Sequence, residues 1–84
     1  MYDIIFSKKA KNQLKKLEKN IQKRIIAVLE RIRIRPEAHV KKLVGESAYK
    51  LRVGNYRILM DIDNGTLLIM VIKIGHRKNV YKEY

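Results

Sequence analysis

The 84-residue sequence contains no cysteine, no tryptophan, one proline and only eight acidic residues. Without cysteine the chain can form neither disulfides nor thiolate metal sites, and it has no cysteine nucleophile. Its two histidines, His39 and His76, lack the clustered partners of a zinc site. We therefore predict that the protein uses no metal and no small-molecule cofactor.

Long hydrophobic runs are also missing. The longest apolar run, Leu67–Ile72, is far shorter than the roughly 18–20 residues that a membrane-spanning helix needs. Near the N-terminus, Asp3 and a lysine run flank a short apolar stretch, and no small-residue cleavage site follows. We expect no signal peptide, no membrane partner and a cytoplasmic location.

Positive charge is abundant. Twenty Lys and Arg against eight Asp and Glu give a net charge of +12, whereas a magnitude of about 2–8 is enough to keep a small domain soluble. An excess of this kind indicates a polyanionic partner. Charge alone is compatible with RNA or DNA, an acidic protein or an anionic membrane surface, and we rank nucleic acid first and an acidic protein second. The 46% of hydrophobic residues excludes a disordered chain and, with the short length, predicts a single domain over residues 1–84.

Hydrophobic periodicity predicts an α+β fold in the order β-α-α-β-β-β. Apolar residues at steps of three and four predict a helical hairpin that packs, with an N-terminal strand, on an antiparallel meander. Arg35-Pro36 ends the second helix, and residues 36–47 read as a loop. The predicted strands are 2–6, 48–53, 56–62 and 66–74, and the predicted helices are 7–18 and 21–34.

The first predicted hairpin gathers cations. If Gly54-Asn55 is a two-residue turn, Arg52 lies directly opposite Arg57, with Lys50 on the same face. Like charges that face each other across two strands destabilise the pair. Folding gains nothing from this arrangement, so it is the first functional signal.

The second turn sets the register of the last strand. A three-residue loop would place Ile62 opposite Thr66, and this is the register we predict. The outcome would be a core-facing set of Leu68, Met70, Ile72 and Ile74, with Lys73 and Arg77 on the basic face. The outer face would carry Leu59, Leu67, Ile69 and Val71, which either contact a partner or indicate that this register is off by one residue.

The C-terminal segment adds groups that can move protons. Gly75 can end the last strand and place His76 and Arg77 on a turn, with Tyr81 close enough to fold back beside them. Cations, an imidazole and a phenol suit a phosphate-binding surface that carries out acid–base chemistry. His39, in the predicted loop, is interpreted as having no role.

In their order and spacing, short motifs along nearly the whole chain resemble the RelE family of toxin–antitoxin toxins, within the RelE/ParE group. They are Tyr2-Asp3-Ile4-Ile5-Phe6, Ala10 and the lysine-rich hairpin, Lys42-Leu43 before Gly45, Tyr49-Lys50-Leu51-Arg52, Tyr56-Arg57, Ile74-Gly75-His76-Arg77 and Val80-Tyr81. The resemblance implies a microbial-RNase-like fold and metal-independent cleavage of mRNA in the ribosomal A site. It also implies two kinds of partner: a RelB-like, acidic antitoxin that wraps the toxin, and the ribosome with its mRNA.

Site residues follow from the same resemblance. Lys50 matches a strand lysine implicated in catalysis, and Arg57 and Arg77 match arginines that hold the scissile phosphate. Tyr81 matches a C-terminal tyrosine that orients or stacks on the substrate.

Two positions depart from the family pattern. Arg52 stands where several relatives have lysine, and because arginine is not deprotonated in proteins it can stabilise charge but cannot act as a base. His76 stands at a position that is basic in relatives. The segment from Arg77 to Tyr81 is shorter than in some members, which leaves Tyr84 as a substitute for Tyr81.

The predicted reaction is attack of an RNA 2′-OH on the adjacent phosphorus, giving a 2′,3′-cyclic phosphate. Lys50 or His76 would take the proton, and the other group or Tyr81 would protonate the leaving 5′-oxygen. Two alternatives stay open. One is a ParE-like toxin that inhibits DNA gyrase without cleaving RNA, and the other is a non-catalytic basic module that binds RNA.

Overall fold

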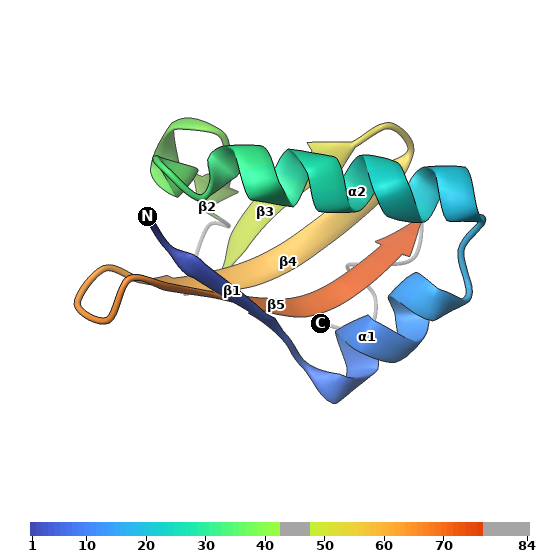
Figure 1. Cartoon of the computed structure of the whole chain (residues 1–84), viewed down its shortest axis with the longest axis horizontal. Helices are drawn as coiled ribbons and strands as arrows, with labels where there is room; N and C mark the ends of the chain where they lie inside the picture. Colours follow the sequence, from blue (N-terminus) through green and yellow to red (C-terminus); the bar gives the residue numbers. More distant parts are fainter. Residues whose placement is uncertain (43–47, 77–84) are drawn as a thin grey trace.

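The computed structural model describes residues 1–42 and 48–76, apart from the side chain of Lys42. Their five strands form one mixed sheet in the order β1-β5-β4-β3-β2, and α2 runs across one face of it (Figure 1). The predicted α+β fold and the β-α-α-β-β-β order are confirmed, with a two-residue strand β2 added inside the predicted loop. The elements are β1 (Asp3–Phe6), α1 (Lys8–Lys15), α2 (Lys19–Ile32), the 3-10 helix η1 (Pro36–Ala38), β2 (Lys41–Lys42), β3 (Tyr49–Val53), β4 (Tyr56–Asp63) and β5 (Leu68–His76).

The core lies between the helices and one face of the sheet, here called the helix-covered face. Helix α2 buries Ile25, Leu29 and Ile32, which recur at steps of three and four, and α1 adds Ala10. Complete burial of one such branched side chain contributes about 1.5–3 kcal/mol. The strands contribute Leu51, Val53, Ile58, Met60, Ile69, Val71 and Ile74. The opposite side of the sheet is called the outer face below.

The hairpin of β3 and β4 has the predicted register. Val53 pairs with Tyr56 and Arg52 pairs with Arg57. Gly54 has a φ of 59°, the left-handed conformation that the first central position of a two-residue hairpin turn requires. The turn therefore holds two arginines directly opposite each other.

The predicted register between β4 and β5 is wrong. Ile62 pairs with Ile69 rather than with Thr66, because the turn is longer than three residues. The Asp63 carboxylate accepts hydrogen bonds from the backbone N–H groups of Gly65 (2.9 Å) and Thr66 (3.3 Å). Leu67, with a φ of 54°, then closes a turn over residues 64–67.

The shift in register exchanges the faces of the first half of β5. Ile69 and Val71 are fully buried in the core, whereas Leu68 and Met70 pair with aspartates on the outer face and are half-buried. The predicted core positions Leu68, Met70 and Ile72 are therefore wrong. The alternative of a register off by one residue is wrong in size, because Ile69 instead of Thr66 lies opposite Ile62, a shift of three residues. It correctly places Ile69 and Val71 in the core, and Leu67 lies in the turn.

A β-bulge restores the predicted faces further along β5. Met60 of β4 pairs with Val71, but the residue before it, Leu59, pairs with Lys73, so Ile72 is the extra residue of β5. Ile74 therefore faces the core and Lys73 the outer face, as predicted, although Lys73 is only 3% exposed.

Helix α1 and its cap satisfy backbone groups at this bulge. The Ser7 hydroxyl accepts from the Ala10 N–H at 3.0 Å as the helix cap and donates to the Ile72 carbonyl at 2.6 Å. The Gln13 side-chain oxygen accepts from the Ile74 N–H at 2.7 Å. These long-range hydrogen bonds stabilise the bulge, since a buried backbone group without a partner is costly.

Strand β1 pairs with β5 in parallel, which makes the sheet mixed. No helix within residues 1–42 and 48–76 is long and apolar enough to cross a membrane.

Candidate nucleic-acid interface

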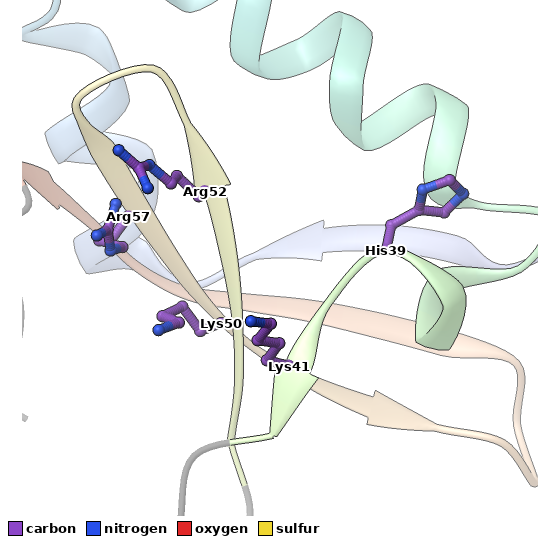
Figure 2. A pocket seen from close by; sticks show the side chains of 5 residues that line it. All are labelled: His39, Lys41, Lys50, Arg52 and Arg57. Atoms are coloured by element: carbon purple, nitrogen blue, oxygen red, sulfur yellow. The ribbon is translucent and has the colours of Figure 1, made fainter.

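Four cations on the outer face form two directly opposed pairs, and we call them the cation cluster. Lys41 of β2 pairs with Lys50 of β3, and Arg52 of β3 pairs with Arg57 of β4. Figure 2 shows the side chains of Lys50, Arg52 and Arg57 extending to the same side of the hairpin. Each pair sets like charges opposite each other, an arrangement that opposes sheet formation.

Arg57 has the clearest capacity to bind an anion. Its Nε and Nη1 atoms are buried, and no described residue supplies a hydrogen-bond acceptor to either of them. Leaving a buried donor without an acceptor costs about 1–3 kcal/mol, and more for a charged group. Among the described residues, Lys41, Arg52 and Arg57 also form no salt bridge. The arrangement suits an anion that approaches from the outer face.

A cavity of about 220 Å³ opens among these side chains. It is lined by the cation cluster and by His39, whose ring points away from the four cations in Figure 2. That volume is below the roughly 300–1,000 Å³ of a pocket for a drug-sized ligand, and it suits a phosphodiester group. Arginine forks bind phosphate oxygens in pairs, and lysines add point charges.

Two residues of this cavity, Lys41 and His39, are not predicted by the sequence patterns. Strand β2 has only two residues, too few for hydrophobic alternation to reveal a strand. The only available signal for Lys41 is its position beside another lysine, and nothing in the sequence singles out His39.

His76 does not join the cation cluster. Strand β5 continues through His76 instead of ending at Gly75, and His76 pairs with Tyr56. Residues that pair directly across strands point to the same face of a sheet. Because Tyr56 also pairs with the core residue Val53, His76 lies on the helix-covered side of the sheet end. Its ring meets that of Tyr56 edge to face, with 5.8 Å between centroids. The prediction that the strand ends at Gly75 and places His76 on a turn at the cation-bearing surface is therefore wrong.

Three predicted positions, Arg77, Tyr81 and Tyr84, lie outside the described residues. Within the part of the chain that the structure describes, no group of three or more His, Asp or Glu side chains could hold a metal ion.

Comparison with known proteins places this geometry in a family. The family model for the ParE toxin of type II toxin–antitoxin systems matches residues 4–81. Toxin RelE3 of Methanocaldococcus jannaschii is 30% identical in an alignment of 84 positions that covers 93% of each chain. The chain belongs to the RelE family of toxins.

Solved structures of RelE toxins share the fold. The toxin–antitoxin complex RelBE2 of Mycobacterium tuberculosis contains a chain that is 28% identical, with a TM-score of 0.77 over 90% of this chain and 98% of that one. The isolated RelE toxin of Escherichia coli is 26% identical, with a TM-score of 0.79 over 99% of this chain and 94% of that one. These toxins therefore share the arrangement described above, in which helices pack on one face of the sheet.

Proposed function

We propose that this chain is the toxin of a toxin–antitoxin pair and that it inhibits translation by cleaving mRNA, without a metal, in the ribosomal A site. The observation that carries the proposal is Arg57, whose buried Nε and Nη1 lack an acceptor among the described residues, within a cluster of like-charged pairs. Membership of the RelE family supports the toxin role. Relatives solved as complexes with RelB support a RelB-like antitoxin as partner.

In the proposed reaction the cation cluster holds the scissile phosphodiester. The 2′-oxygen attacks phosphorus, the bond from phosphorus to the 5′-oxygen breaks, and the products are a 2′,3′-cyclic phosphate and a 5′-hydroxyl. Arg57 and Arg52 would neutralise the charge that develops on the phosphate oxygens. Preorganised electrostatic stabilisation of this kind often contributes more to catalysis than any other effect.

Proton transfer needs a second set of groups. Lys50 stands in the same cluster and would accept the 2′-OH proton in its neutral form. On the strength of the family resemblance, Arg77 is proposed as a further phosphate ligand and Tyr81 as the group that orients the substrate or protonates the 5′-oxygen. His76, on the other side of the sheet end, is left out of this set.

The test is primer extension on an mRNA in a translating extract, with Arg57→Met as the variant. This change keeps most of the apolar stem and removes the charge. We expect cuts inside codons with the wild type, and a reduction of about 10²–10³-fold in the variant, the loss typical of removing one donor to a developing oxyanion. Arg31→Met, on the exposed side of α2, is the matched control and should cut normally. A product that ends in a free 3′-hydroxyl would contradict attack by the 2′-OH.

A second function is favoured by one observation, the name of the matching family model, which describes ParE toxins. A gyrase inhibitor that cleaves no RNA needs no phosphate-binding cation cluster on this face. Folded wild-type protein that leaves mRNA intact but blocks DNA supercoiling by gyrase would establish that function instead. Protein that binds RNA without cutting it would indicate a non-catalytic RNA-binding module.

A further inference from the structure

A second cavity, of about 250 Å³, lies at the tip of the β3–β4 hairpin on the helix-covered side. Figure 1 shows the first turns of α2, the β3–β4 turn and the end of β5 on the same side of the molecule. The described residues that line this cavity include Ile21, Arg24, Gly54, Asn55, Tyr56 and His76. None of the predicted mRNA-cleaving residues on the outer face belongs to it.

The chemistry of this cavity is aromatic and cationic. Tyr56 and His76 meet edge to face at an interplanar angle of 81°, so a planar ligand that stacks on one ring meets the edge of the other. The guanidinium of Arg24 lies against Gly54, where a Cβ would stand 3.5 Å from Nη1. No described acidic residue lines the cavity, so an anion would meet no repulsion from a neighbouring carboxylate.

We propose that this cavity binds one nucleotide of the RNA, close in sequence to the cleaved one. The base would lie against Tyr56 and His76, and its phosphate would pair with Arg24. Stacking on aromatic side chains together with backbone contacts to cations is how proteins hold single-stranded RNA. The volume is below that of a pocket for a drug-sized ligand and suits a single base.

Position in the hairpin connects the two sites. The Val53–Tyr56 pair directly follows the Arg52–Arg57 pair in the β3–β4 ladder, so the pairs are about 3.3 Å apart along the strands and point to opposite faces. Because Val53–Tyr56 is the last pair before the turn, an RNA strand that places its scissile phosphate on Arg57 needs to pass only the hairpin tip to enter the second cavity. In this form the inference rests on the proposed RNA cleavage.

The test uses adenosine monophosphate, adenosine and inorganic phosphate as separate probes, at constant ionic strength. Backbone amide shifts of the 15N-labelled whole chain should respond to adenosine monophosphate at Gly54, Asn55 and Tyr56, and more weakly to adenosine. Arg24→Ala should reduce the affinity for the nucleotide about tenfold, the effect of one charge-assisted hydrogen bond. Arg31→Ala, an equal loss of charge on the same helix, should change it less than twofold.

The outcomes separate the inference from the proposed function. RNA cleavage without any nucleotide-induced shift at the hairpin tip would overturn the nucleotide site and leave the cleavage proposal standing. Shifts at the tip in a protein that does not cleave RNA would support a nucleotide site and overturn its link to cleavage. An equal response to inorganic phosphate alone, with no contribution from the base, would contradict the base-binding role of Tyr56 and His76.

Discussion

The same β-sheet carries two faces that use alternation for opposite purposes. On the helix-covered face, Ile58 and Met60 alternate into a fully buried core. On the outer face, β2 and β3 set Lys41 against Lys50, and β3 and β4 set Arg52 against Arg57. One face contributes stability through burial of apolar surface, while the other sets like charges opposite each other, which lowers stability. Residues that oppose folding on an otherwise regular strand are therefore the basis for the phosphate-binding site proposed above.

The largest effect on stability is expected from the helix-covered face. Ile58→Ala leaves a cavity among fully buried side chains and should reduce the free energy of unfolding by about 2–5 kcal/mol. Ile5→Ala is the matched control, because Ile5 is 41% exposed on β1, and it should cost much less. Urea denaturation measures both. Equal losses would show that the two environments do not differ as described.

A smaller effect of opposite sign is expected on the outer face. Arg52→Thr removes one member of the Arg52–Arg57 pair and introduces a residue with high β-propensity. It should raise the free energy of unfolding by about 0.2–1 kcal/mol at low salt. At 1 M salt, where the Debye length is about 3 Å, the gain should shrink. A loss of stability at low salt would mean that the pair is not repulsive.

The smallest effect concerns the turn that sets which residues of β5 reach each face. Hydrogen bonds from the Thr66 side chain, the Thr66 N–H and the Gly65 N–H lower the pKa of Asp63 below its usual range. Since the folded-state pKa is lowered, the carboxylate stabilises the fold above the unfolded pKa of about 3.9, and this stabilisation is lost as the pH falls through the folded value. Asp63→Asn should therefore be slightly less stable than the wild type at pH 7. The difference should shrink at pH 3 and below, as measured by urea denaturation, and a difference independent of pH would contradict this role of the carboxylate.

Periodicity and turn chemistry predict much of this fold from the sequence. The helical hairpin follows from apolar residues at steps of three and four, and the β3–β4 register follows from Gly54. That register alone brings Lys50, Arg52 and Arg57 together.

The register of β5 could not be predicted, for two physical reasons. Leu67 adopts a left-handed φ that sequence rules assign to glycine. The turn that contains Gly65 is therefore longer than the three-residue loop that the sequence predicts. The bulge at Ile72 depends on hydrogen bonds from Ser7 and Gln13, more than 60 residues away in sequence. Local sequence patterns do not indicate such long-range contacts. For the same reason, the pairing of Lys41 with Lys50 could not be predicted.

The proposed function requires that the outer face loses folding stability in order to bind an RNA phosphate. Its most direct test is urea denaturation of the wild type and Arg57→Met, with and without an RNA that cannot be cleaved because a 2′-deoxynucleotide replaces the attacking one. Without RNA, the variant should be as stable as the wild type or more stable, because a buried charge without a described acceptor has been removed. With RNA, the wild type should gain more stability than the variant, since a ligand stabilises the folded state to a degree that rises with its affinity. A variant that is less stable without RNA, and that gains as much stability from RNA as the wild type, would contradict RNA binding by Arg57 at the expense of folding stability.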